Sequence, residues 1–146
     1  MIVVDASVVV TALADDGPDG DRVRARLRGE RLTAPEVIDL EVVAAWRRLV
    51  TAGHLDGPRA QLALQDLGEL RLRRVSHRPL LVRCWELREN LTIYDAAYVA
   101  LAELLDVALL TADVRLASAP GPQCRVEVLA PVSPGPAAPA AEPSGS

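Results

Sequence analysis

The chain contains no lysine, so all 16 of its basic residues are arginine. A P-loop needs a lysine on the nucleotide phosphates and Schiff-base catalysis needs one as its nucleophile, so both kinds of site are excluded. Receiver domains have a similar size and a similar alternation of strands and helices. They depend on a lysine beside their acidic pocket, so they are excluded as well. Phenylalanine is also absent, and there are only 2 tyrosines and 2 tryptophans. The core is therefore expected to consist of valine, leucine, isoleucine and alanine.

Cysteine and histidine are scarce too. Cys84 and Cys124 are the 2 cysteines, which is too few and too widely spaced for a disulfide framework or a zinc site. His54 and His77 have no partner at metal-ligand spacing and are expected in loops. No apolar run reaches membrane-spanning length. The apolar N-terminus lacks a positively charged start and is interrupted by Asp5, so a signal peptide is not expected. We predict a cytoplasmic protein with no membrane partner.

The composition is that of a globular domain. A chain of 146 residues, 50% of them hydrophobic, is large enough for one core. The net charge of −4 argues against a nucleic-acid partner, but the guanidinium groups of clustered arginines bind phosphate in a bidentate manner. Each cluster is either a phosphate-binding surface or a solvated helix face. The clusters are Arg22, Arg24, Arg26, Arg28 and Arg31; Arg47 and Arg48; and Arg71, Arg73 and Arg74.

The hydrophobic pattern alternates short strands with helices. Thr33 and Glu36 have capping-box spacing and Pro35 suits a first turn, so a helix is predicted from there to about Ala52. The alternation predicts an α/β fold with a largely parallel sheet. The expected strands cover residues 2–5, 32–34, 72–75, 107–111 and 126–129. The other expected helices cover residues 7–14, 19–28, 58–70, 79–89, 92–105 and 113–117.

The composition changes after Pro131. Residues 132–146 are rich in proline, alanine and serine, and such a segment cannot bury an apolar surface. We therefore predict one domain over residues 1–131 and a disordered tail over residues 132–146.

Two acidic residues directly follow predicted strands. Asp5 ends the first apolar run, and Asp113 follows the run that ends at Thr111. Either carboxylate could simply cap the next helix. Ligands in open parallel sheets, however, bind beyond the carboxyl ends of the strands at the switch point. If the two strands are neighbours, both carboxylates face one crevice, where the hydroxyls of Ser7 and Thr111 could hydrogen-bond.

Glu41 lies within an apolar helix. At 3.6 residues per turn, it shares the core-facing side with Val37, Ala44 and Ala45. Arg48, two turns away, offers a salt-bridge explanation. A bound cation explains the position better, because a buried and unpaired carboxylate would take up a proton.

Asp95 also lies in an apolar helical segment and has the strongest structural alternative. Thr92 and Asp95 have capping-box spacing, and an acidic residue suits the positive end of the helix dipole. The two roles are compatible, because a capping carboxylate keeps one oxygen free. Glu103, in the same segment, is explained by arginine and solvent near the helix end and is left out of the site.

Four segments that contain these acids resemble the motifs of PIN-domain proteins. They read Ile-Val-Val-Asp-Ala-Ser from residue 2, Ala-Pro-Glu-Val-Ile-Asp-Leu-Glu-Val from residue 34, Leu-Thr-Ile-Tyr-Asp-Ala-Ala-Tyr-Val-Ala-Leu-Ala from residue 91, and Leu-Thr-Ala-Asp-Val-Arg-Leu-Ala from residue 110. The spacing and the short length resemble VapC-type toxins of bacterial toxin–antitoxin pairs. The resemblance covers about residues 1–130.

This resemblance implies a PIN-like three-layer sandwich with a mainly parallel sheet of four to five strands. It also implies a Mg²⁺- or Mn²⁺-dependent endoribonuclease that forms a homodimer. The implied partners are RNA and a cognate VapB-like antitoxin that inserts into the groove of the acids, giving a heterotetramer or a larger complex. The implied metal-binding and catalytic acids are Asp5, Glu41, Asp95 and Asp113, with Ser7 and Thr111 as supporting groups.

The expected chemistry is hydrolysis of a phosphodiester by a metal-activated water, with Arg115 holding the RNA backbone. A phosphatase of the haloacid-dehalogenase type is disfavoured, because it wants an aspartate where Ser7 stands and a lysine that the chain lacks. The remaining alternative is a non-catalytic PIN-like module that binds protein or RNA.

Overall fold

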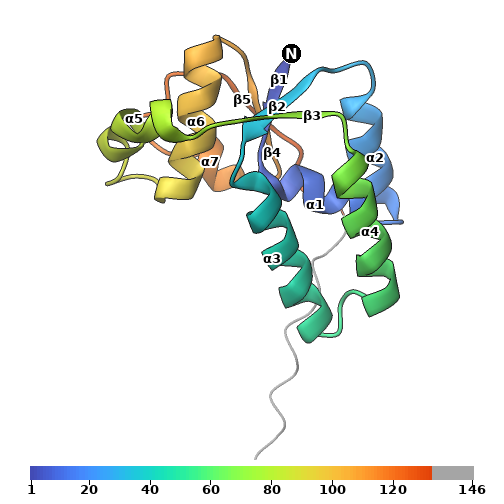
Figure 1. Cartoon of the computed structure of the whole chain (residues 1–146). Coiled ribbons are helices and arrows are strands. Elements are labelled where there is room, and N and C mark those ends of the chain that lie inside the picture. The colour runs from blue at the N-terminus through green and yellow to red at the C-terminus, as the bar shows by residue number, and fades with distance from the viewer. Residues whose placement is uncertain (133–146) are drawn as a thin grey trace, which may run out of the picture.

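The computed structural model describes residues 1–132. Its centre is a five-stranded parallel sheet in the order β3-β2-β1-β4-β5 (Figure 1). Except for Val132, the predicted disordered tail lies outside the described residues. The strands are β1 (Ile2–Val4), β2 (Leu32–Pro35), β3 (Leu72–Val75), β4 (Leu109–Thr111) and β5 (Val126–Val128).

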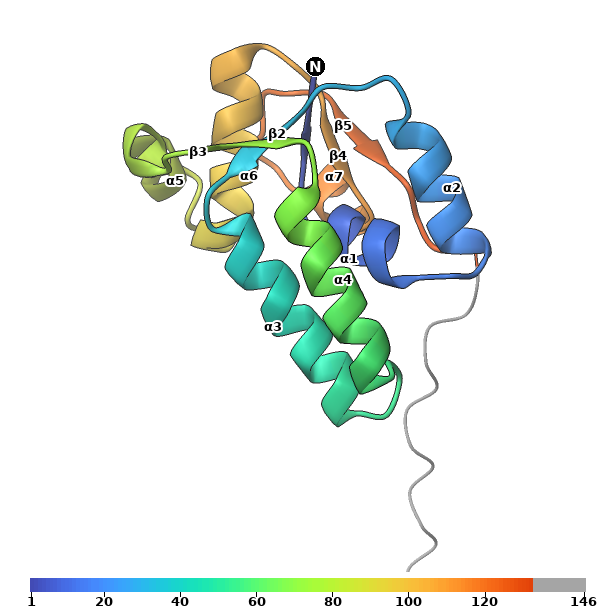
Figure 2. The ribbon, with the colours of Figure 1, turned by 45° about the vertical axis from the view of Figure 1, so that its right-hand side comes forward.

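Helices cover both faces of the sheet, so the predicted three-layer sandwich is confirmed. The helices α1, α2 and α4 lie on one side, with α3 packed against α1 and α4, while α6 packs on β1, β2 and β4 from the other side together with α5 (Figure 2). The helical segments are α1 (Ala6–Ala14), α2 (Pro18–Leu27), α3 (Ile38–Thr51), α4 (Gly57–Glu69), the 3₁₀ turn η1 (Arg78–Leu80), α5 (Leu81–Glu86), α6 (Ile93–Leu105) and α7 (Val114–Ser118).

The core contains the residue types that the missing phenylalanines require. Val3, Val4, Leu109 and Leu110 of the two central strands are fully buried. The largest fully buried side chain is that of Tyr98 on α6. Within residues 1–132, none of the helices combines the length and apolar composition that crossing a membrane requires.

The predicted start of the third helix is wrong. Pro35 ends β2 and pairs with Val75 of β3, and the Glu36 amide donates to the Val75 carbonyl at 2.8 Å. Thr33 is buried within the sheet and does not cap a helix. The helix begins only at Ile38, because strand pairing outweighs the local capping signal.

Two other predicted boundaries are also wrong. The helix predicted over residues 79–89 is a 3₁₀ turn followed by α5, which ends at Glu86. The strand predicted over residues 107–111 begins at Leu109, where pairing with Val126 begins. The other elements lie within one residue of their predicted bounds.

Candidate active site

The order of the strands reverses at β1 and β4, which are parallel neighbours with Val4 opposite Leu110. Asp5 directly follows β1, and Asp113 lies two residues after β4. The two acids therefore occupy the carboxyl edge of the sheet at its switch point, where open α/β sheets bind ligands. Asp95 in the first turn of α6 and Glu41 in the first turn of α3 complete the group.

Asp5 is buried and held by three donors. Its carboxylate caps α1 by accepting the Val8 amide at 3.3 Å, and it also accepts the Ser7 hydroxyl at 2.5 Å and the Thr111 hydroxyl. Asp5 therefore caps α1, as the sequence allowed, and it also lies at the crevice. Burial raises the pKa of Asp5, the three hydrogen bonds oppose that rise, and Asp95 adds to it.

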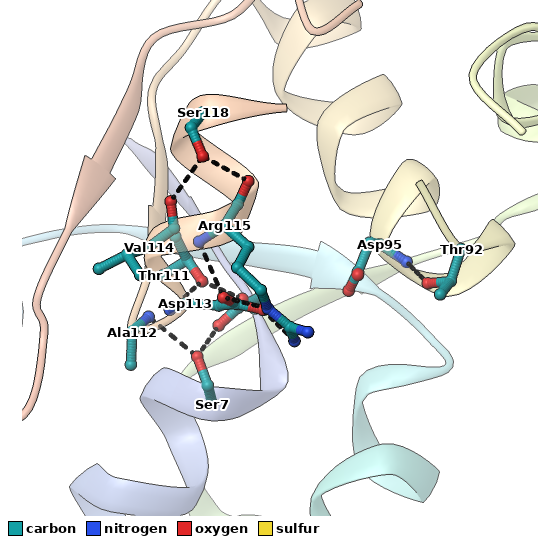
Figure 3. A network of polar contacts seen from close by, with 10 residues as sticks. Ser7, Thr92, Asp95, Thr111, Ala112, Asp113, Val114, Arg115 and Ser118 are labelled. Atoms are coloured by element: carbon teal, nitrogen blue, oxygen red, sulfur yellow. Dashed lines mark hydrogen bonds and ion pairs between the residues drawn. The ribbon is translucent and has the colours of Figure 1, made fainter. Parts of the chain in front are cut away.

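The hydroxyls of Ser7 and Thr111 also connect the two strand ends. Ser7 Oγ accepts the Ala112 amide at 3.0 Å, and Thr111 Oγ1 accepts the Asp113 amide at 3.0 Å (Figure 3). Both residues lie where the sequence predicts supporting groups. The network fixes the segment after β4 relative to the start of α1.

Glu41 is half-buried and accepts a hydrogen bond from the Tyr98 hydroxyl at 2.7 Å. Burial raises its pKa most, Tyr98 lowers it, and repulsion from Asp95 and Asp5 raises it further. Arg48 lowers it least and, within residues 1–132, makes no ion pair with it. The sequence prediction missed Tyr98. Tyr98 lies three residues after Asp95 and therefore on the same side of the helix, and this spacing could have indicated a place near the acids.

Asp95 lies across the crevice from Asp113, and its carboxylate points toward the network at the end of β4 (Figure 3). Thr92 caps α6 by accepting the Asp95 amide at 3.1 Å, as the capping spacing predicted. Burial raises the pKa of Asp95 most, the Thr92 hydroxyl lowers it, Asp113 raises it and Arg115 lowers it. Asp95 therefore combines a capped helix start with a carboxylate that faces the other acids.

Asp113 caps α7 and forms an ion pair with Arg115. Its carboxylate accepts the Arg115 amide at 3.0 Å, and Arg115 Nη2 lies 3.0 Å from Asp113 Oδ2. The guanidinium holds the pKa of Asp113 below its usual range. Arg115 is 87% exposed, so this predicted RNA-binding residue stands at the mouth of the crevice, bound to an acid.

Other arginines that the sequence singled out are used in surface ion pairs. Arg24 pairs with Asp21, Arg26 with Glu30 and Glu127, and Arg74 with Asp39. Arg24 and Arg26 lie on the helix α2, whereas Arg74 lies on β3 and is 26% exposed, so the interpretation as a solvated helix face does not apply to Arg74. Glu103, which the sequence analysis left out of the site, forms an ion pair with Arg83 at 2.8 Å. An arginine partner therefore explains its position, as expected.

The acids fit a hard divalent cation. Within residues 1–132, Asp5, Glu41 and Asp95 form no ion pair, and burial and mutual repulsion raise their pKa values. A donor set made only of carboxylate and hydroxyl oxygens suits Mg²⁺ or Mn²⁺. No three acidic, histidine or cysteine side chains of the described part stand close enough to enclose a metal ion. A cation bound by these acids would therefore complete its coordination with water, as Mg²⁺ commonly does in proteins.

A groove of about 650 Å³ runs beside the acids between α1 and α3. Glu41, Ala44, Ala45 and Arg48 line it from α3, and Ser7 lines it from α1. The small side chains predicted beside Glu41 thus border open space. The groove has an acidic end, an apolar middle and one arginine.

The sequence matches known proteins over most of its length. The family model of the PIN domain matches residues 2–122. Ribonuclease VapC1 of Mycobacterium tuberculosis is 44% identical over 128 residues, which are 87% of this chain and 96% of that protein. Ribonuclease VapC12 of the same organism is 38% identical over 130 residues, which are 89% of this chain and 100% of that protein.

Solved structures share the fold. VapBC2 from Rickettsia felis, crystallised bound to a DNA fragment from their promoter, superposes with a TM-score of 0.62 at 14% identity and covers 88% of this chain and 98% of that chain. PAE2754 from Pyrobaculum aerophilum superposes with a TM-score of 0.59 at 21% identity and covers 80% of this chain and 82% of that chain.

Proposed function

This chain belongs to the PIN domain family as a VapC-type ribonuclease, and we propose that its acidic crevice cleaves RNA internally with the help of Mg²⁺ or Mn²⁺. One observation carries the proposal. Asp5 and Asp113 follow neighbouring strands at the switch point, and burial and repulsion raise the pKa values of Asp5, Glu41 and Asp95. Within residues 1–132, Asp5, Glu41 and Asp95 have no ion-pair partner, and a bound cation would offset the repulsion between them.

Asp5, Glu41, Asp95 and Asp113 would hold the cation, directly or through waters. Once bound, it supplies an acidified water and neutralises charge on the scissile phosphate. Ser7 and Thr111 keep Asp5 in place by donating to its two oxygens.

Of Asp95 and Asp113, Asp95 is the one that we propose accepts a proton from the attacking water. Its pKa is raised, whereas the pKa of Asp113 is held low by Arg115, and a general base works best with a pKa near the working pH. Arg115 would contact the RNA backbone, because its guanidinium is 87% exposed beside the acids and can bind a phosphate in a bidentate manner.

The groove beside the acids supports a protein partner. We propose that a cognate VapB-like antitoxin inserts here, with apolar side chains over Ala44 and Ala45 and a basic group toward Glu41. Occupation would block RNA from the acids and make the chain the toxin of a toxin–antitoxin pair. The homodimer, and the heterotetramer or larger complex with antitoxin, remain predictions from the family.

Cleavage of RNA by the purified chain tests the proposal. We expect cleavage with Mg²⁺ or Mn²⁺, none in EDTA, and a loss of at least about a hundredfold in Asp5→Asn while the circular dichroism spectrum is retained. An unchanged rate in Asp5→Asn would overturn it. RNA binding in EDTA without cleavage after metal is added would instead support a non-catalytic module.

A further inference from the structure

A buried tyrosine lies beneath the acidic crevice. Tyr98 is 1% exposed, and its hydroxyl donates to Glu41 Oε1 at 2.7 Å. The bond connects α6 to α3, two helices that are far apart in the sequence. We propose that Tyr98 is a positioning residue that fixes the Glu41 carboxylate so that its second oxygen faces the metal-binding crevice. This inference rests on the proposed function.

The neighbours of Tyr98 keep its hydroxyl a donor. Burial raises the pKa of this phenol most, and the negative charges of Glu41, Asp5 and Asp95 raise it further. Because an ordinary tyrosine already has a pKa of about 10, the Tyr98 hydroxyl is protonated at neutral pH. Because the phenol is neutral, it can hold a carboxylate without cancelling the charge that attracts a cation.

Glu41 depends on this one bond, whereas Asp5 is held by several donors. Within residues 1–132, Tyr98 donates the one hydrogen bond that the Glu41 side chain accepts, whereas Asp5 accepts three. A glutamate also has one more rotatable bond than an aspartate, so it loses more order when it is released. With Oε1 held by Tyr98, Oε2 accepts no hydrogen bond within residues 1–132 and is open to the crevice.

The test compares two variants that each remove one hydroxyl from α6. Tyr98→Phe keeps the buried ring, and Tyr94→Phe is the matched control on the same helix, since Tyr94 is 58% exposed. Mn²⁺ binding to the metal-free full chain is measured by calorimetry. Loss of an outer partner of a metal ligand weakens binding by about 10- to 100-fold, and we expect that range for Tyr98→Phe and a change below about twofold for Tyr94→Phe.

A second pair of variants separates positioning from packing. If Tyr98 acts through Glu41, then Tyr98→Phe should weaken Mn²⁺ binding no further in a Glu41→Gln background. A Tyr98→Phe variant that melts earlier but binds Mn²⁺ like the wild type would overturn the inference. Equal weakening in both backgrounds would overturn it too.

The crystal structure of metal-free Tyr98→Phe gives a readout that needs no metal. We expect the Glu41 side chain to leave its wild-type rotamer, and an unchanged Glu41 would refute the positioning role. Absence of Mn²⁺ binding in the wild type would overturn the proposed function instead, so the two failures are distinguishable.

Discussion

At the scale of single residues, the site gathers carboxylates whose burial in the ionised form destabilises the folded protein. Asp5, Glu41 and Asp95 all have raised pKa values, with burial as the largest cause. Asp5 is compensated by three donors, and Asp113 by an arginine. Asp95 is compensated less, because only the Thr92 hydroxyl and Arg115 lower its pKa, and Glu41 is in the same position with Tyr98 and Arg48.

Replacing Asp95 by asparagine should therefore stabilise the metal-free protein and inactivate it. The amide removes a charge that burial and Asp113 disfavour, while Thr92 still caps the helix. We expect the melting temperature to rise by roughly 2–4 °C, the shift that about 1 kcal/mol produces in a domain of this size. Scanning calorimetry in EDTA measures it, with Glu103→Gln as a control that should melt earlier. A lower melting temperature for Asp95→Asn would contradict the assignment.

Arg115→Gln tests the RNA contact at the mouth of the crevice. Loss of one phosphate contact should raise KM for RNA several-fold and make the dependence of log KM on log salt shallower by about 1. Arg125→Gln is the matched control, because Arg125 is 76% exposed and precedes β5 at the opposite edge of the sheet. An unchanged KM in Arg115→Gln would contradict the RNA contact, and pairing with Asp113 would be the remaining role of Arg115.

At the scale of elements, the sequence predicts order and type well and boundaries less well. The alternation of apolar strands and helices depends on local periodicity, so the parallel sheet and the positions of Asp5 and Asp113 could be predicted. The start of α3 could not, because Pro35 pairs with Val75, a residue 40 positions away. Tyr98 was missed for the same reason, since its hydroxyl reaches Glu41 on another helix.

The start of α6 offers a test at this scale. The Thr92 hydroxyl accepts the Asp95 amide at 3.1 Å, and loss of such a cap costs about 1 kcal/mol. Thr92→Ala should lower the free energy of unfolding by roughly that amount in urea titrations. Ser118→Ala, which removes an exposed hydroxyl bonded within α7, should change it by less than about 0.5 kcal/mol. Equal stability of the two variants would show that Thr92 does not hold this helix end.

At the scale of the whole molecule, the acids divide into two groups with opposite effects on stability. Asp5, Glu41 and Asp95 have raised pKa values, so the folded state binds their protons more tightly than the unfolded state does. Asp113, Glu103 and Glu127 have lowered pKa values because arginines pair with them. Their stabilisation is present above the ordinary carboxyl pKa of about 4 and is lost below it.

The stability of the metal-free chain should therefore rise as the pH falls toward about 4, because acids with raised pKa values take up protons above that pH in the folded state. It should fall again below about 4, as the arginine pairs are lost. Saturating Mg²⁺ should flatten the first slope, because the cation binds the ionised acids of the folded state. Urea denaturation across this range measures both effects. Stability that falls steadily from pH 7 downward would contradict the burial of uncompensated acids.

The most direct test is anomalous diffraction from crystals grown with Mn²⁺. The predicted result is one or more manganese peaks in the crevice between Asp5 and Asp95, within direct or water-mediated reach of Glu41 and Asp113. The same peaks should be absent in Asp5→Asn crystals and present in Glu103→Gln crystals. A wild-type crystal without manganese in the crevice, or with manganese only elsewhere, would contradict the claim that these four acids form one metal-dependent site.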